Sequence, residues 1–197
     1  MTTADLTLRA FSEAVASDAP TPGGGSTGAV AGALASALVA KVAAVCTRRA
    51  ENGDPILHDI NAQATAHRSA LFTLADGDAD SYDVVVAAYR LPKATDDQKR
   101  SRRAAVQSAL RAATEVPLES AERCAEVIQL AEALAPLAHG PVVSDLAVAR
   151  ALARSSLVSV SAIAQANLAE LRDPAYVSET AARLDRLTAF SQTGAAR

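Results

Sequence analysis

Apolar residues recur at spacings of three and four along most of the chain, which is the pattern of amphipathic helices rather than of strands. The first such segment has Phe11 and Val15 on one face, with a cap expected at Thr3 or Asp5. Prolines and glycines then predict a loop over residues 18–25, because proline disfavours helical geometry in the residue before it.

The segment from residue 26 to residue 46 carries two parallel ridges of side chains. Small residues recur at every fourth position, at Gly28, Gly32, Ser36, Ala40 and Ala44. The bulkier ridge beside them consists of Val30, Leu34, Leu38 and Val42. A small ridge lets another helix approach closely, so we expect a long central helix capped by Ser26 or Thr27. The segment has nearly the apolar length of a membrane span, but its alanine content and Lys41 favour a buried core helix.

Five further helices are expected, over residues 56–74, 82–90, 96–134, 144–172 and 174–192. A turn at residues 76–80 separates the first two. Pro117 is expected to kink or divide the longest helix, since proline lacks a backbone donor and clashes with the preceding turn. Ser144 is the expected N-cap of the next helix, and Pro174 fits the first turn of the last. The pattern therefore predicts an all-α fold, a single bundle of about five to seven helices in one domain over residues 1–197.

Composition supports this fold class and narrows the function. Alanine, the strongest helix former, is the commonest residue, whereas Phe and Tyr number three each and Trp is absent. The net charge of -3 gives no electrostatic reason to bind nucleic acid or an anionic membrane. The N-terminal residues lack the basic and apolar stretches of a targeting signal, so we expect a cytoplasmic protein. Its two cysteines, Cys46 and Cys124, are then expected to be free buried thiols.

Two short motifs could carry chemistry, and each also has a plain structural explanation. The sequence PGGGS over residues 22–26 opens a helix, so its backbone amides could receive an anionic or carbonyl group. Equally, its glycines could serve only to form a tight turn. Ser144 and Asp145 stand where a loop enters a helix, and capping together with the helix dipole is sufficient to explain both.

Other charged groups give weaker signals. The acidic run Asp76, Asp78 and Asp80 lacks the glycine and glutamate that a calcium loop needs, and a solvated capping turn explains it more simply. The basic residues at 99–103 form either an exposed helix face or a patch that attracts an anionic ligand tail. The three histidines are not spaced as paired helical metal ligands, so no metal site is expected.

Taken in this order, the motifs resemble the formiminotetrahydrofolate cyclodeaminase and methenyltetrahydrofolate cyclohydrolase family along nearly the whole chain. The resemblance is carried by TPGGGSTGAVAGALASALVAKVA at 21–43, DGDADSYDVVVAAYRLPK at 76–93, RRAAVQSALRAATEVPL at 102–118, SDLAVARALA at 144–153 and NLAELRD at 167–173. Its most specific parts are the glycine loop that leads into a small-residue helix and the AAYRLPK ending.

The resemblance implies an all-α homodimer that binds a tetrahydrofolate, with no cofactor beyond this substrate. The implied reaction is hydrolysis of 5,10-methenyl-tetrahydrofolate or cyclodeamination of 5-formimino-tetrahydrofolate, at the bridge between the N5 and N10 nitrogens. Proton transfer in either reaction is assigned first to Asp145 and then to Asp78. The residues implied to bind substrate are Pro22, Gly23, Gly24, Gly25, Ser26, Tyr82, Lys93, Arg102, Arg103 and Ser144, with the basic ones facing the glutamate tail.

The chain departs from the family pattern at two places. Gly140 is followed by Pro141 where the family has Gly-Asn, and Ile163 with Ala164 stands where the family has Asn-Val. An alternative therefore stays open, in which the chain is a catalytically altered member that acts as a folate-binding or structural helical dimer. Since no formimidoyltransferase domain precedes the matched segments, the cyclohydrolase reaction is slightly favoured.

Overall fold

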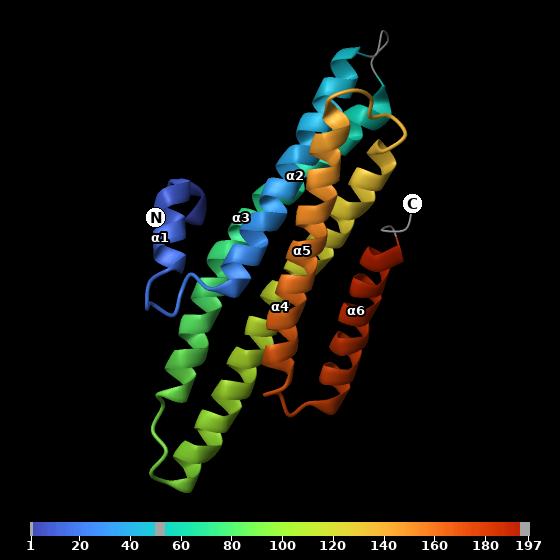
Figure 1. Ribbon diagram of the computed structural model, residues 1–197. Helices are drawn as coiled ribbons and strands as arrows, with labels where there is room; N and C mark the ends of the chain where they lie inside the picture. The colour runs from blue at the N-terminus through green and yellow to red at the C-terminus, as the bar shows by residue number, and fades with distance from the viewer. Residues whose placement is uncertain (1, 50–53, 194–197) are drawn as a thin grey trace.

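The computed structural model describes residues 2–49 and 54–193, with the side chains of residues 190–193 left out (Figure 1). Within these ranges the chain forms six α-helices, one short 3-10 helix and no strand. The elements are η1 (Thr3–Asp5), α1 (Leu8–Val15), α2 (Gly24–Arg49), α3 (Pro55–Tyr89), α4 (Asp96–Leu134), α5 (Val142–Leu168) and α6 (Pro174–Thr193). The all-α prediction is confirmed.

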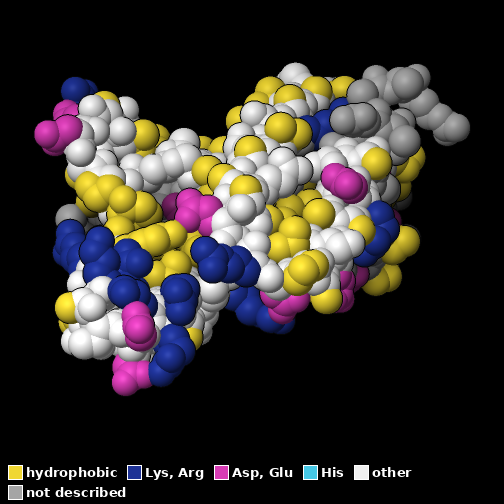
Figure 2. All heavy atoms as spheres, turned by 90° about the horizontal axis from the view of Figure 1, so that it is seen from below, with side chains coloured by type: hydrophobic (Ala, Val, Ile, Leu, Met, Phe, Trp, Pro, Cys, Tyr) yellow, Lys and Arg dark blue, Asp and Glu magenta, His cyan; other side chains and the backbone are white. Residues whose placement is uncertain are grey.

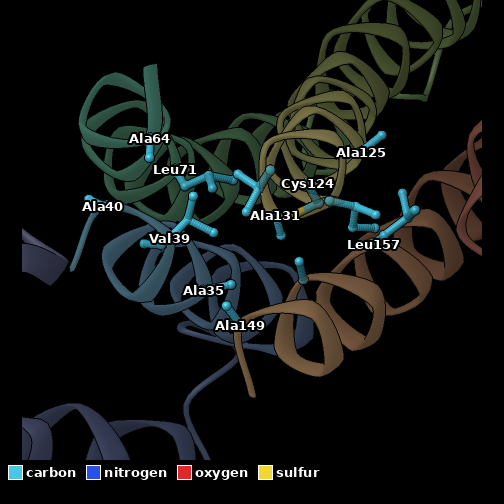
Figure 3. Packing of buried hydrophobic residues seen from close by; sticks show 14 of the residues in the cluster. Ala35, Val39, Ala40, Ala64, Leu71, Cys124, Ala125, Ala131, Ala149 and Leu157 are labelled. Atoms are coloured by element: carbon cyan, nitrogen blue, oxygen red, sulfur yellow. The ribbon is translucent and has the colours of Figure 1, made fainter. Parts of the chain in front are cut away.

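Four long helices, α2 to α5, run alternately up and down and enclose the hydrophobic core (Figure 1). α2 packs against α3 and α5, and α4 packs against the same two helices, while α6 lies along α4 and α5. Figure 3 shows side chains from all four helices pointing to a common centre, among them the fully buried Val39, Leu71 and Leu157. α1 has no buried residue and stands beside the bundle (Figure 1).

Small residues on α2 allow the neighbouring helices to approach its backbone. A Cβ added to Gly32 would lie 2.8 Å from Cys124 Sγ on α4 and 2.9 Å from Ser156 Oγ on α5. The Ser156 hydroxyl also donates a hydrogen bond to the carbonyl of Gly28. α2 is therefore the central small-residue helix that the sequence predicts. Cys46 and Cys124 are free and buried, as expected, and burial raises the pKa of the Cys124 thiol to about 11.

The DGDAD sequence is not a turn, and the prediction of two shorter helices on either side of it is wrong. α3 continues through it as one helix that includes Gly77. The acidic side chains reach to neighbouring elements, because Asp76 accepts a hydrogen bond from the backbone of Thr3 and Asp78 accepts one from the backbone of Ser26. Glycine inside a helix costs only about 1 kcal/mol relative to alanine, so these tertiary contacts decide the local structure.

The first helices also begin at other places than expected. Thr7 caps α1, so the cap predicted nearer the N-terminus is wrong. α2 already begins at Gly24, and Ser26 and Thr27 therefore lie inside its first turn rather than at its cap. The Thr27 hydroxyl donates to the carbonyl of Gly23 instead of accepting from the backbone. Gly24 and Gly25 thus belong to the helix, whereas Gly23 is the last residue of the connection in front of it.

The later helices follow the prediction more closely. Thr95 and Gln98 form a capping box at the start of α4, and Pro117 lies inside this helix without dividing it. α6 begins at Pro174, as predicted. Ser144, however, is not the N-cap of α5, since the helix begins two residues earlier and the Ser144 hydroxyl donates to the carbonyl of Pro141.

By length and composition, α2 and α5 are the two described helices that are apolar enough to cross a membrane. In α2, 61% of the apolar window is buried inside the bundle, whereas in α5 the buried share is 39%. The exposed remainder includes Leu34, Val148 and Val158. We refer to the outward surface of this helix pair, over residues 24–41 of α2 and residues 145–163 of α5, as the α2–α5 face.

Candidate active site

A cleft lies at the end of the bundle where α2 begins and α5 ends. Figure 1 shows that the α3–α4 hairpin extends beyond these two helix ends. Its volume is about 390 Å³. Of the residues expected to bind or act on the substrate, those that line this cleft are Gly23, Gly24, Gly25, Asp78 and Tyr82. Figure 2 views the molecule from below and shows a hollow with acidic and apolar side chains, with Lys and Arg side chains gathered next to it.

Asp78 holds the start of α2 from the facing helix α3. Its Oδ2 accepts a 2.8 Å hydrogen bond from the Ser26 backbone N–H and lies 3.0 Å from the Ser26 hydroxyl oxygen. The same hydroxyl lies 2.8 Å from the carbonyl oxygen of Ala75. A carboxylate at this place complements the positive end of the α2 dipole. Asp78 therefore caps α2 from outside the helix, and it also lines the cleft.

The three consecutive glycines have different reasons to be glycine. A Cβ added to Gly25 would collide with the Asp78 carboxylate, so Asp78 can cap α2 only if residue 25 has no side chain. At Gly23 the nearest atom to an added Cβ is the carbonyl oxygen of Pro20 at 3.6 Å, and at Gly24 it is Ile163 Cδ1 at 3.4 Å. Those two positions have space for a methyl group. Gly25 is therefore required by packing, whereas Gly23 and Gly24 leave backbone open to the cleft.

A second acidic group enters the cleft from the end of α5. Glu170 Oε2 accepts a 2.6 Å hydrogen bond from the hydroxyl of Tyr89 at the end of α3. This hydrogen bond raises the pKa of Tyr89. Both residues line the cleft together with Asp78, and its walls include the apolar side chains of Leu110 and Ile163. The cleft thus combines two carboxylates with an apolar surface, which suits a flat cationic ligand.

Tyr89 and Glu170 also line an adjoining cavity of about 420 Å³, together with Arg102, Arg103 and Arg172. The Arg102 guanidinium donates two 3.0 Å hydrogen bonds to the carbonyl of Tyr89 and lies over its ring at 5.4 Å. Arg102 thus satisfies a carbonyl at the end of α3. Arg103 has no such contact in the described part of the chain, so it is the better placed of the two to meet an anionic ligand tail.

Four predicted substrate-binding residues line neither the cleft nor the adjoining cavity, namely Pro22, Ser26, Lys93 and Ser144. Ser26 is fully buried, with its hydroxyl between Asp78 and Ala75. Pro22 is half-buried and lies directly before the cleft-lining glycines. Lys93 is exposed in the connection between α3 and α4. Their positions give Ser26 a supporting role behind the cleft and place Lys93 on the surface beyond the end of α3.

Asp145, the first predicted proton-transfer group, lies at the other end of the α2–α5 face with Ser144. Its Oδ2 is 2.7 Å from Nζ of Lys41 on α2. At ~1.5 Å per residue, Lys41 and Gly24 are about 25 Å apart along α2, so one chain cannot place Asp145 in its own cleft. The structure therefore separates the two predicted carboxylates, with Asp78 in the cleft and Asp145 remote from it.

Sequence reasoning did not single out Tyr89, Asn167 or Glu170, all of which line the cleft. Each lies inside a motif that carries the family resemblance, but a motif shows only which residues are neighbours along the chain. Tyr89 and Glu170 are 81 residues apart, and only the antiparallel packing of the helices makes them neighbours. In the described ranges, no group of three or more His, Cys, Asp or Glu side chains is placed to hold a metal ion.

Known proteins resemble this chain in both sequence and fold. A family model described as formiminotransferase-cyclodeaminase matches residues 7–186. Methenyltetrahydrofolate cyclohydrolase from Methylorubrum extorquens is 36% identical over 185 residues, which cover 93% of this chain and 89% of that protein. Formimidoyltransferase-cyclodeaminase from Rattus norvegicus is 29% identical over 194 residues, and the match spans 98% of this chain but 36% of the rat protein.

A solved structure agrees with the sequence relatives. The crystal structure of formiminotetrahydrofolate cyclodeaminase from Thermotoga maritima matches with a TM-score of 0.85 at 27% identity, covering 96% of this chain and 92% of that one. The resemblance carried by the sequence motifs is thus confirmed by the family model, by the relatives and by the fold. The chain belongs to the formiminotransferase-cyclodeaminase family.

Proposed function

We propose that this protein is a folate one-carbon enzyme that hydrolyses 5,10-methenyl-tetrahydrofolate to 10-formyl-tetrahydrofolate. The observation that carries the proposal is the position of Asp78, whose carboxylate lies in an apolar cleft at the N-terminus of α2, beside the open backbone of Gly23 and Gly24. The relative from Methylorubrum extorquens, matched over nearly its whole length, is named for this reaction.

The reaction needs a negative group close to a cationic carbon. Water adds its oxygen to the bridge carbon between N5 and N10 and loses one proton, which gives a neutral tetrahedral intermediate. The bond from carbon to N5 then breaks with its electron pair on N5, while the hydroxyl proton is transferred to N5 and a formyl group remains on N10. A carboxylate can stabilise the cation and move these protons, so Asp78 fits both needs.

The rest of the cleft fits the remainder of the ligand. Apolar side chains from α4 and α5, among them Leu110 and Ile163, can pack on the fused ring system. The adjoining cavity with Arg103 and Arg172 offers positive charge for the glutamate carboxylates. Glu170 is held by Tyr89 between the two cavities, and adds negative charge on the side of the cationic ring.

Cyclodeamination of 5-formimino-tetrahydrofolate is the second candidate reaction. In it, N10 attacks the formimino carbon and ammonia leaves, which passes through the same type of tetrahedral carbon. The structural neighbour from Thermotoga maritima, with a TM-score of 0.85, favours this reading because it is named for that activity. The same cleft residues would serve either reaction. The two reactions are therefore distinguished by which of the two substrates the protein converts.

The two reactions are separated by two assays on one preparation. The absorbance of 5,10-methenyl-tetrahydrofolate is followed against its spontaneous hydrolysis, and ammonia release is followed with 5-formimino-tetrahydrofolate. We expect acceleration of the first reaction. Ammonia release without that acceleration would select cyclodeamination. Folate binding without turnover of either substrate would select the alternative of a catalytically altered folate-binding member.

We further propose that the protein is a cytoplasmic homodimer that binds neither nucleic acid nor membrane. The α2–α5 face supports the dimer, since Leu34, Val148 and Val158 are exposed on it. At ~1.5 Å per residue the face is about 27 Å long, so across two packed helices it offers about 500 Å² per copy, and contacts beyond the face would have to complete the ~800 Å² per partner of a stable interface. Sedimentation at micromolar concentration tests this, and a monomer would contradict it.

A further inference from the structure

Tyr89 and Glu170 lie where the cleft and the adjoining cavity meet. Of the described residues, these two alone line both spaces, whose volumes are about 390 Å³ and about 420 Å³. A folate has two corresponding parts, since N5 belongs to its ring system and N10 begins the chain that ends in the glutamate tail. With the rings in the cleft and the tail in the cavity, as proposed above, the N5–N10 bridge passes close to Glu170.

Three hydrogen bonds fix the segment that carries Glu170. Its Oε2 accepts a 2.6 Å hydrogen bond from the hydroxyl of Tyr89, the last residue of α3. On α4, the side-chain nitrogen of Gln107 donates to the carbonyl of Glu170 at 3.1 Å, and the side-chain oxygen of Gln107 accepts from the N–H of Arg172 at 2.7 Å. Both the carboxylate and the backbone of Glu170 are thus held by neighbouring helices, so the carboxylate has a fixed place at the junction.

The carboxylates of Asp78 and Glu170 have different surroundings. Asp78 accepts a hydrogen bond from the backbone of Ser26, so a proton on Asp78 would remove the charge that faces the positive end of α2. Glu170 follows the end of α5 and is exposed, and among the described residues no hydrogen bond reaches its Oε1. Glu170 can therefore take up and release a proton without loosening the start of a helix.

We propose that Glu170 is the proton-transfer residue of this site and that Tyr89 is its positioning residue, while Asp78 stabilises the cationic bridge. The inference rests on the proposed hydrolysis of 5,10-methenyl-tetrahydrofolate and deepens it. The type of side chain would allow Asp78 to perform both tasks, but its two contacts with Ser26 suit the electrostatic one. The two tasks are thus divided between two carboxylates of one chain.

The protons of the reaction balance in this arrangement. Glu170 Oε1 receives the proton that the attacking water loses, which leaves the neutral tetrahedral intermediate, and it releases this proton to solvent. Ionised again, Glu170 takes the hydroxyl proton of the intermediate and gives it to N5 as the bond from carbon to N5 breaks with its electron pair on N5. The formyl group remains on N10, Glu170 is again a carboxylate, and one proton is released in each turnover.

Substitution of Glu170 separates proton transfer from folate binding. Glu170→Gln keeps the size of the side chain and an acceptor for the Tyr89 hydroxyl, but an amide does not accept a proton at neutral pH. Turnover should fall about 100-fold, while the melting temperature is kept and folate affinity changes less than about threefold. Glu179→Gln, an exposed change on α6, is the control and should remain as active as wild type. Wild-type turnover in a folded Glu170→Gln protein would overturn the proposal.

A small carboxylate from solution gives a readout that a purely structural role would not change. Glu170→Ala leaves space beside Tyr89 that acetate can enter. Acetate should therefore raise the turnover of this variant about tenfold, after subtraction of a blank that contains the same acetate without protein, and should leave wild type unchanged. No recovery with acetate, or a loss of folate affinity as large as the loss of turnover, would overturn the role of Glu170 in proton transfer.

A double variant tests whether Tyr89 acts through Glu170. Tyr89→Phe removes the hydroxyl but keeps the ring, so turnover should fall about tenfold with little change in KM. Combined with Glu170→Gln it should cause little further loss, because the group that it positions is already absent. Losses that multiply would overturn the positioning role. Acceleration of the hydrolysis by wild type upholds the proposed function in each of these cases, whereas an inactive wild type would overturn both that function and this inference.

Discussion

The side-chain amide of Asn167 donates a 2.9 Å hydrogen bond to the backbone carbonyl of Ala113 on the neighbouring helix. In an uninterrupted helix this carbonyl would accept from the N–H of residue 117, but residue 117 is a proline and has none. Asn167 therefore supplies the donor that Pro117 lacks. The contact joins the end of α5 to the middle of α4 in the wall of the cleft.

This contact predicts a stability effect that depends on the proline. Asn167→Ala leaves the Ala113 carbonyl without its donor, so the free energy of unfolding in urea should fall by about 1–3 kcal/mol. Gln165→Ala, an exposed change on the same helix, is the control. In a Pro117→Ala background the backbone regains its own donor, and the loss should shrink. Equal losses in both backgrounds would contradict the link between the two residues.

The glycine run predicts unequal effects of the same substitution. Gly25→Ala places a methyl group where the Asp78 carboxylate lies, so we expect a lower melting temperature and a large loss of turnover. Gly23→Ala adds a methyl group 3.6 Å from the nearest atom and should keep the wild-type melting temperature. Thermal melts of the two variants check this. Equal melting temperatures would show that Asp78 can move without cost.

The buried His67 predicts how stability depends on pH. Burial lowers its pKa from the ordinary 6.5, and its Nδ1 lies 3.4 Å from the Glu126 carboxylate. The unfolded chain therefore binds this proton more readily than the native state, so stability is full above pH 6.5 and is lost as pH falls through the lowered pKa. His67→Gln should flatten the decrease in melting temperature between pH 7 and pH 5. His58→Gln, an exposed change on the same helix, should not.

The two neighbouring arginines predict different phenotypes. Arg103→Ala should weaken the preference for polyglutamylated over monoglutamylated folate at low salt. The Arg103 side chain lines the adjoining cavity and has no other contact among the described residues. Arg102→Ala should instead lower the melting temperature, since it removes two hydrogen bonds to the carbonyl of Tyr89. Competition binding at two salt concentrations separates these effects. An unchanged preference in Arg103→Ala would contradict this role and show that Arg103 is only an exposed residue on the surface of α4.

Much of the fold could be predicted from the sequence, because alanine content, three- and four-residue spacings and small-residue ridges are local signals that tertiary packing reinforces. The DGDAD segment was an exception. Its composition favours a turn, but Thr3 and Ser26 provide partners for Asp76 and Asp78 from other elements, and this keeps α3 continuous. No local pattern could reveal those partners, since they are more than 50 residues away.

The candidate site could be predicted only in part. Motifs led to the glycine run and to Asp78, which the structure brings together in one cleft. The hydrogen bond between Tyr89 and Glu170 depends on helix packing, so no local motif indicated it. The sequence also grouped Asp145 with the glycine run, whereas a single chain holds them about 25 Å apart. That grouping stays a prediction about the assembled protein.

Turnover by Asp78→Asn tests the central claim most directly, because Asp78 is the acidic residue that one chain places beside the glycine run. Hydrolysis of 5,10-methenyl-tetrahydrofolate is followed for wild type, for Asp78→Asn and for the exposed control Asp80→Asn, with folate affinity and melting temperature measured alongside. The account predicts that Asp78→Asn loses about 100-fold or more in turnover, with much smaller changes in affinity, while Asp80→Asn remains active. Wild-type turnover in a folded Asp78→Asn protein would contradict it.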